Sequence, residues 1–280
     1  MREVRRAVVA GSWYPATAGA LAAAVDRHLE AADGDARGGR VADLVAIVAP
    51  HAGLMYSGPV AAHAYRLLRD RPFDLVVLVG PSHFVGFEGV SVYPSGGFDT
   101  PFGVAMIADE CAAALIEASP LVRNHPPAHV REHSLEMQLP FVKHLAPDAR
   151  IVPLLMGFQT PRTAQALGDA LHRVLHGRPR TLLVASTDLS HYHDAATAAR
   201  LDAVVVDCVS RFDPEALQHA LDLHPEHACG GGPTVAVMRA ARQLGARHAA
   251  VLHYADSGDV SGDKSAVVGY LAAAFGTVTA

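Results

Sequence analysis

Short runs of apolar residues alternate with longer amphipathic stretches along this chain. The runs Leu44–Ala49, Leu75–Val79 and Leu182–Ala185 are rich in Val, Leu and Ile, and a similar run covers residues 151–157. Continuous apolar runs of this length, bounded by Pro, Gly and polar residues, are typical of strands buried on both faces. We therefore predict four strands of a sheet that is covered on both sides.

Stretches with helical periodicity or a high Ala content separate these runs. They predict helices at residues 18–32, 58–70, 107–118, 161–176, 194–211 and about 233–244. The end of the chain, after residue 248, is expected to form two strands around a polar loop. Strand and helix alternate without a break in composition, which favours one α/β domain over residues 1–280. We expect a mixed, largely parallel sheet with helices on both faces.

Titratable residues follow three of the predicted strands at their carboxyl ends. The first strand stops at Pro50, because proline cannot donate to a ladder, and His51 comes next. His83 follows the second strand, and Asp188 and His191 follow the third. Open α/β sheets keep their ligand crevices outside the carboxyl ends of parallel strands. We therefore expect these side chains to converge in one polar cluster.

Cys229 adds a sulfur to the candidate chemistry. It precedes three glycines and Pro233, which can occupy the first turn of a helix. A helix N-terminus favours negative charge, so we expect this thiol to ionise more readily than a free one.

Two uses of this thiol are open. With His51 and His83 it can bind one metal ion, in an arrangement like the 2-His-1-carboxylate site with thiolate in place of carboxylate. Alternatively, Cys229 is a nucleophile and one histidine is its base. We favour the metal site, because a Cys–His pair would leave the other strand-end histidine without a role.

Asp188 and His191 are spaced three residues apart in the segment TDLSH. We expect His191 to act as an acid or base beside the metal and Asp188 to orient an imidazole. They could instead be two further ligands, or form a hydrogen-bonded loop network.

Two further pairs of residues are candidates for the surroundings of the cluster. His133 and Glu136 are expected to orient the ligand imidazoles, although they could equally satisfy backbone groups at a helix end. Trp13 and Tyr14 are expected to wall a pocket, since aromatic side chains with a polar tip serve well there. The alternative for Trp13 is simple packing in the core or at its rim.

Composition narrows the class of protein. The chain has 280 residues, 18% charged residues and a formal net charge of −5, so we expect no general nucleic-acid surface. No apolar run reaches the roughly 20 residues of a membrane span. Three cysteines without paired spacing indicate reduced thiols in a cytoplasmic protein. Phosphate-binding glycine motifs, HExxH and GxSxG are absent, while 17 histidines favour metal or proton chemistry.

Six segments occur in a fixed order along the chain: AGSWYPA, APHAGLMYSGPVAAHAY, VGPSHF, EHSLEMQLPF, STDLSHY and CGGGPTVAV. Together they resemble the MEMO family, whose bacterial and archaeal branch is called AmmeMemoRadiSam system protein B. The resemblance covers nearly the whole chain. It implies a fold similar to that of class III extradiol (LigB-type) dioxygenases, with a metal pocket at one edge of the sheet.

The resemblance also implies roles for individual residues. The metal ligands of the family match His51, His83 and Cys229, and the Asp and His of its third pocket motif match Asp188 and His191. In the related dioxygenases a glutamate stands where this chain has Cys229, and the acid/base histidine corresponds to His191. The thiolate sets this pocket apart from that of a catechol-cleaving enzyme.

The function that the resemblance implies has two versions. In the first, one transition-metal ion (iron or copper, with zinc as a further option) supports redox or oxygenase activity on a small substrate. In the second, the chain is a non-catalytic metal-binding or interaction module that works with AMMECR1-type and radical-SAM proteins.

Overall fold

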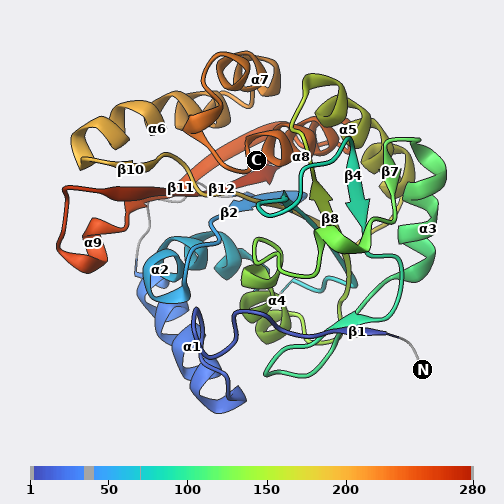
Figure 1. Cartoon of the computed structure of the whole chain (residues 1–280), viewed down its shortest axis with the longest axis horizontal. Coiled ribbons are helices and arrows are strands. Elements are labelled where there is room, and N and C mark those ends of the chain that lie inside the picture. The colour runs from blue at the N-terminus through green and yellow to red at the C-terminus, as the bar shows by residue number, and fades with distance from the viewer. Residues whose placement is uncertain (1–2, 35–40, 70, 279–280) are drawn as a thin grey trace.

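The structure is a computed structural model that describes residues 3–34, 41–69 and 71–278 (Figure 1). Four parallel strands form the centre of its main sheet, in the order β2 (Ala46–Ala49), β9 (Thr181–Ser186), β3 (Leu75–Pro81) and β8 (Arg150–Met156). Nearly every residue of these strands is buried, as their continuous apolar runs predict. Because the four strands are parallel, their carboxyl ends lie at the same edge of the sheet.

Antiparallel strands flank this parallel centre. Beside β2 lies β12 (Val267–Gly276), which also pairs with β11 (His248–Asp256) and β10 (His191–His193). Beside β8 lies β4 (Val90–Val92), which pairs in parallel with β7 (Val122–Arg123). A smaller sheet holds β1 (Val4–Arg5), β5 (Gly97–Phe98) and β6 (Ala105–Met106).

Helices cover both faces of the main sheet. In Figure 1, α1 (Ala18–Asp33), α2 (Leu54–Tyr65) and α4 (Leu139–Leu145) lie below it. On the other side lie α3 (Asp109–Ala118), α5 (Pro161–Leu175), α6 (Ala195–Ser210), α7 (Pro214–Leu223) and α8 (Gly231–Gln243). The one-turn helix α9 (Gly258–Ser261) joins β11 to β12. The predicted class, one α/β domain with a mixed sheet flanked by helices, is confirmed.

Short 3₁₀ turns complete the connections, at η1 (Arg66–Leu68), η2 (Pro126–Ala128), η3 (Glu136–Gln138) and η4 (Pro225–His227). The start of one predicted helix is wrong. The helix expected from residue 58 begins at Leu54, whose N–H donates to the Trp13 carbonyl, so an N-terminal segment satisfies a helix end that sequence spacing cannot reveal. In the segment after residue 133, η3 continues into α4 with Pro140 in the first turn of α4.

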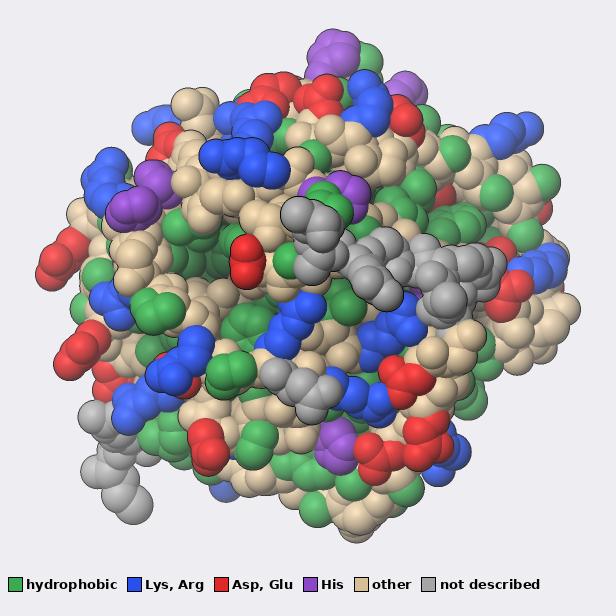
Figure 2. All heavy atoms as spheres, turned by 180° about the vertical axis from the view of Figure 1, so that it is seen from behind, with side chains coloured by type: hydrophobic (Ala, Val, Ile, Leu, Met, Phe, Trp, Pro, Cys, Tyr) green, Lys and Arg blue, Asp and Glu red, His purple; other side chains and the backbone are tan. Residues whose placement is uncertain are grey.

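Charged side chains of both signs are intermixed on the face seen in Figure 2, with histidines at its upper rim. The surface on this side therefore has no field of a single sign. Among the described residues, no helix is both long and apolar enough to cross a bilayer.

Candidate metal site at the sheet edge

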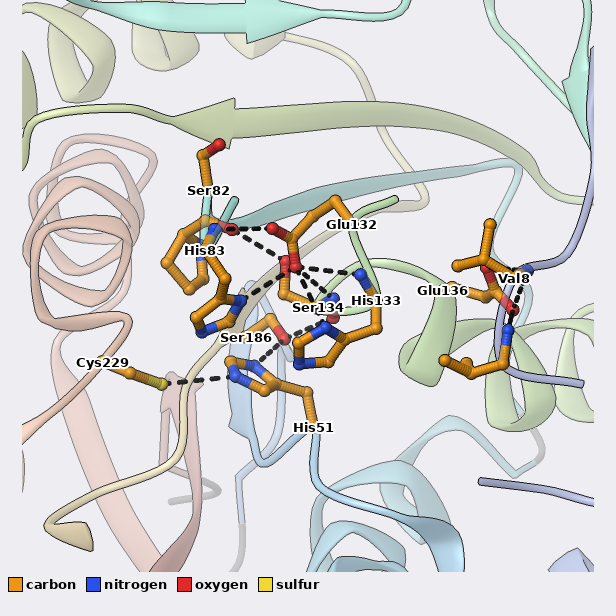
Figure 3. A network of polar contacts seen from close by, with 12 residues as sticks. Val8, His51, Ser82, His83, Glu132, His133, Ser134, Glu136, Ser186 and Cys229 are labelled. Carbon is orange, nitrogen blue, oxygen red and sulfur yellow. Dashed lines mark hydrogen bonds and ion pairs between the residues drawn. The ribbon is translucent and has the colours of Figure 1, made fainter. Parts of the chain in front are cut away.

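Three imidazoles meet beyond the carboxyl ends of the central strands (Figure 3). His51 follows β2 and is buried, and its ring centroid lies 5.2 Å from that of His83, which follows β3. His133 precedes η3, and its ring centroid lies 4.7 Å from that of His83 and 5.7 Å from that of His51. One ring nitrogen from each of the three lies within 4.8 Å of the others, so this group could hold a metal ion.

Hydrogen bonds fix which nitrogen of His51 faces the cluster. The Ser186 hydroxyl, at the end of β9, donates to the Ser134 carbonyl at 2.7 Å and accepts from the Gln138 amide at 2.8 Å. Because the hydroxyl hydrogen already bonds the Ser134 carbonyl, the oxygen can only accept a hydrogen bond from His51 Nδ1, 2.8 Å away. Nε2 of His51 therefore carries the lone pair of the ring, and burial, with the charges of the neighbouring histidines, lowers the pKa of the ring. The imidazole is neutral and ready to act as a ligand.

Glu132 sets the orientation of His83. Its Oε1 accepts from His83 Nδ1 at 2.9 Å, and its Oε2 accepts from the His83 backbone N–H at 2.6 Å. The backbone N–H groups of His133 and Ser134 also donate to Oε1, both at 2.9 Å. Burial alone would raise the pKa of this carboxyl, but the hydrogen bonds and charge of His83, with the Ser134 bond, lower it to about 2. The carboxylate thus keeps the proton of His83 on Nδ1 and leaves Nε2 for a ligand.

The orienting role that we expected of Glu136 belongs to Glu132 instead. Glu136 points away from the imidazoles in Figure 3 and accepts hydrogen bonds from the backbone N–H groups of residues 8 and 9 and from Tyr14 Oη. Arg5 pairs with the same carboxylate at 2.8 Å. Glu136 therefore anchors the N-terminal segment. Glu132 lies four residues before Glu136, the first residue of η3. Their spacing in the sequence therefore does not show which of them faces the imidazoles.

The sulfur of Cys229 adjoins the imidazoles. Sγ lies 3.3 Å from His51 Nε2 and accepts from the Asp188 backbone N–H at 3.3 Å. Gly230 allows this approach, because a Cβ there would lie 2.3 Å from the Ser186 carbonyl oxygen at the end of β9. The thiol is within reach of an ion bound at His51, while the group of three mutually close nitrogens contains His133 rather than Cys229.

The expected easy ionisation of Cys229 is wrong for the protein without metal. Burial of the sulfur, and next the carboxylate of Asp188, raise the pKa of the thiol. These effects outweigh the N-terminus of α8, because a partial helix charge is small beside a full carboxylate charge at close range. A coordinated metal reverses this balance, since a coordinating thiol is deprotonated outright.

Asp188 and His191 belong to the segment that follows β9. Asp188 is buried, and its Oδ1 accepts from the backbone N–H of His51 at 2.7 Å, while Oδ2 lies 4.0 Å from His51 Nε2. Burial raises the pKa of Asp188, and the charge of His191 acts in the opposite direction. Asp188 thus fixes the backbone of a ligand residue. His191 is partly exposed on β10 and stands at the solvent side of the site.

Trp13 and Tyr14, expected as pocket walls, have different surroundings. The Trp13 ring is 38% exposed and its centroid lies 4.5 Å from that of His133. Tyr14 is buried, and its hydroxyl donates to Glu136 at 2.8 Å. Both residues line a cavity of about 490 Å³ between α1 and α2. Trp13 is therefore the one of this pair that contacts the imidazole cluster.

Cys229 also borders a cavity of about 290 Å³. Gln159 borders it and spans the loop, donating from Nε2 to the Cys229 carbonyl at 2.6 Å and accepting from the Gly232 N–H at 2.7 Å. Sequence reasoning missed Gln159, because an amide in a strand-to-helix loop carries no motif. Its bonds hold the cysteine loop against the start of α8.

The donor atoms that the structure brings together fit a transition-metal ion. Imidazole nitrogens suit iron, copper and zinc, and an adjacent sulfur favours the softer of these ions. The fold and the site therefore define a class: an α/β protein with a histidine cluster suited to metal at the carboxyl edge of its parallel strands.

Comparison with known proteins shows to which family within this class the chain belongs. The model of the Memo-like protein family matches residues 5–274, and this chain belongs to that family. It is 38% identical to a MEMO1 family protein of Ignicoccus hospitalis, over 97% of this chain and 98% of that protein. It is 36% identical to a MEMO1 family protein of Methanothermobacter thermautotrophicus, over 95% of this chain and 98% of that protein. The resemblance found in the six sequence segments is confirmed.

A solved structure shares the fold at low sequence identity. It is titled "Crystal structure of uncharacterized protein JW3007 from Escherichia coli K12", and it matches with a TM-score of 0.53 and 16% identity. The match covers 81% of this chain and 99% of that one. It supports the fold alone, so the likeness to LigB-type dioxygenases stays a prediction.

Proposed function

We propose that this chain binds one transition-metal ion, iron or copper in preference to zinc, at His51 and His83, with His133 and Cys229 completing the set of donors. The ion would serve redox or oxygenase-like chemistry on a small substrate. The observation that carries this proposal is the hydrogen bonding of His51 and His83, which directs the Nε2 lone pair of each ring into one cluster beside a sulfur. Purely structural histidines need no such matched tautomers.

The residues around the donors supply the remaining parts of a reactive site. An iron or copper ion would contribute one-electron and oxygen chemistry when bound. His191, partly exposed on β10, is the side chain that we assign as the acid or base beside the ion. Trp13 and Phe84 flank His133, with ring centroids 4.5 Å and 5.9 Å from it, and are both partly exposed. They form an apolar wall that excludes water on the side where an organic substrate would enter.

The same exposed aromatics favour a second candidate function. Phe84 is 49% exposed and lies under the guanidinium of Arg131, 5.0 Å from its ring centroid. Exposed aromatic and arginine side chains are enriched where proteins meet partners. The alternative is a non-catalytic metal-binding module that docks AMMECR1-type or radical-SAM proteins over this mouth.

Metal reconstitution followed by oxygen-uptake measurement tests the proposal. Protein stripped of metal under anaerobic conditions is titrated with iron(II) or copper(I), beside the variants His51→Ala and His219→Ala, the latter an exposed control on α7. We expect His51→Ala to bind one ion fewer than the parent protein and His219→Ala to match it. The loaded parent, given a reductant and a phenolic substrate, should consume oxygen.

Equal ion binding by His51→Ala and the parent would overturn the metal site. Full binding without oxygen uptake under any reductant would instead support the non-catalytic alternative.

A further inference from the structure

A second group of metal-type donors lies on the turn between α7 and α8. His224, Glu226 and His227 belong to η4 or directly precede it, and one donor atom of each lies within 4.8 Å of the others. The two imidazoles stack nearly parallel, with centroids 5.1 Å apart and an interplanar angle of 8°. His224 Nδ1 lies 3.2 Å from Glu226 Oε1. These residues form a compact cluster that the family resemblance does not cover.

The local backbone explains why these side chains gather. Leu223 ends α7, and Pro225 opens a 3₁₀ turn in which the His227 N–H donates to the His224 carbonyl at 3.2 Å. In a 3₁₀ turn, side chains three residues apart are eclipsed, so His224 and His227 share one face. Proline at the first position fixes this geometry before any ligand arrives.

A buried nitrogen gives a second, independent indication of a ligand. His227 is only 5% exposed, and its Nδ1 is buried without a hydrogen-bond partner among the described residues. A buried polar nitrogen without a partner destabilises the folded chain unless a ligand pairs with it. The side chains of His224 and Glu226 remain more than half exposed, so an ion can enter from solvent.

We propose that His224, Glu226 and His227 bind a divalent ion of the zinc type, at a site separate from the imidazole cluster of His51. Two imidazoles and one carboxylate are one of the donor sets found in three-ligand zinc sites, whose fourth position stays open to water. Tetrahedral donors 2.1 Å from an ion lie about 3.4 Å apart. His224 Nδ1 and Glu226 Oε1 already lie 3.2 Å apart. To bind one ion together with His227, the exposed His224 ring must turn out of its stack so that both ring planes contain the ion.

The location gives this site a structural effect. Only Ala228 separates His227 from Cys229, and Pro225, Ala228 and Cys229 border one cavity of about 290 Å³. An ion held by the turn would tie the end of α7 to the loop that carries the sulfur. Binding to the folded chain alone also stabilises it by mass action.

Zinc and cobalt titration in a background without the first site tests the proposal. Chelator-treated His51→Ala/His83→Ala protein should bind one Zn²⁺ per chain, raise its Tm with added Zn²⁺, and develop the visible bands of tetrahedral cobalt with Co²⁺. Adding His224→Ala or Glu226→Gln should weaken binding at least tenfold, since loss of a group that merely orients a ligand already costs about 10–100-fold. Adding His219→Ala, an exposed histidine on the same helix–turn segment, should change nothing.

No ion in the double-variant background, or unchanged affinity after His224→Ala, would overturn the second site. Both substituted ligands are exposed, so loss of fold does not confuse the result. The first site is tested separately with the single variants: His224→Ala should still bind an ion there, and His51→Ala should not.

Discussion

Replacing Glu132 with glutamine tests how the imidazoles are held. The change keeps the shape of the side chain but removes the charge and one acceptor oxygen. Oε1 accepts from three N–H groups, two of the backbone and one of the His83 ring, while Oε2 accepts from the His83 backbone N–H alone. The glutamine amide keeps the most hydrogen bonds when its oxygen takes the place of Oε1. The NH₂ group then faces the His83 backbone N–H, which loses its acceptor.

The expected magnitude follows from this loss. A buried donor without a partner costs about 1–3 kcal/mol, and each remaining bond weakens because bonds to charged groups are worth about 1.5–3 kcal/mol. We expect the metal-free Glu132→Gln variant to lose about 2–4 kcal/mol of unfolding free energy. The weaker hold on His83 Nδ1 should lower metal affinity about 10–100-fold.

Glu136→Gln is the matched control. This carboxylate is equally buried and accepts a similar number of bonds, but they tie down the N-terminal segment and Tyr14 rather than an imidazole. Chemical denaturation of the metal-free proteins measures stability, and iron(II) or copper(I) titration measures affinity. Both variants should be destabilised, and only Glu132→Gln should bind metal more weakly.

The reasoning fails if Glu136→Gln loses as much metal affinity as Glu132→Gln. It fails equally if Glu132→Gln binds metal as the parent protein does while losing stability.

Three further predictions concern other parts of the fold. Gly230→Ala places a methyl group against the Ser186 carbonyl, so it should cost about 1–3 kcal/mol in chemical denaturation and weaken metal binding by moving the cysteine loop; unchanged affinity would contradict the close approach. Burial lowers the pKa of His129 to about 3, so the unfolded chain takes up a proton below about pH 6.5 that the folded chain refuses. Metal-free stability should therefore fall by about 1.4 kcal/mol per pH unit between pH 6 and pH 4 through this group, and His129→Gln should show a shallower slope. Thr160→Ala removes the cap of α5 and should cost about 1 kcal/mol in denaturation with no change in metal affinity.

The strands and the positions of His51 and His83 could be predicted because their signals are local. A short apolar run ending in a proline or a glycine marks a buried strand, and parallel strands bring whatever follows them to one edge. Two of the four central strands are followed directly by these histidines, so topology alone places their rings together. No contact between residues distant in sequence had to be known to predict this.

The partners of those histidines could not be predicted in the same way. His133, Glu132 and Glu136 belong to a segment without regular periodicity, and which acid faces the cluster depends on the path of the N-terminal segment that Glu136 binds. The raised pKa of Cys229 likewise comes from burial and then from Asp188, which lies 41 positions away in sequence. Such contacts are set by tertiary packing and leave no trace in the spacing of either residue.

X-ray absorption spectroscopy at the edge of the bound metal tests the central claim most directly. In anaerobically loaded protein, we expect imidazole nitrogens at about 2.0–2.1 Å from the metal and one sulfur at about 2.3 Å. The sulfur signal should disappear in Cys229→Ser while the imidazole signal persists. A shell of oxygen ligands alone, or a spectrum unchanged by His51→Ala, would contradict the account.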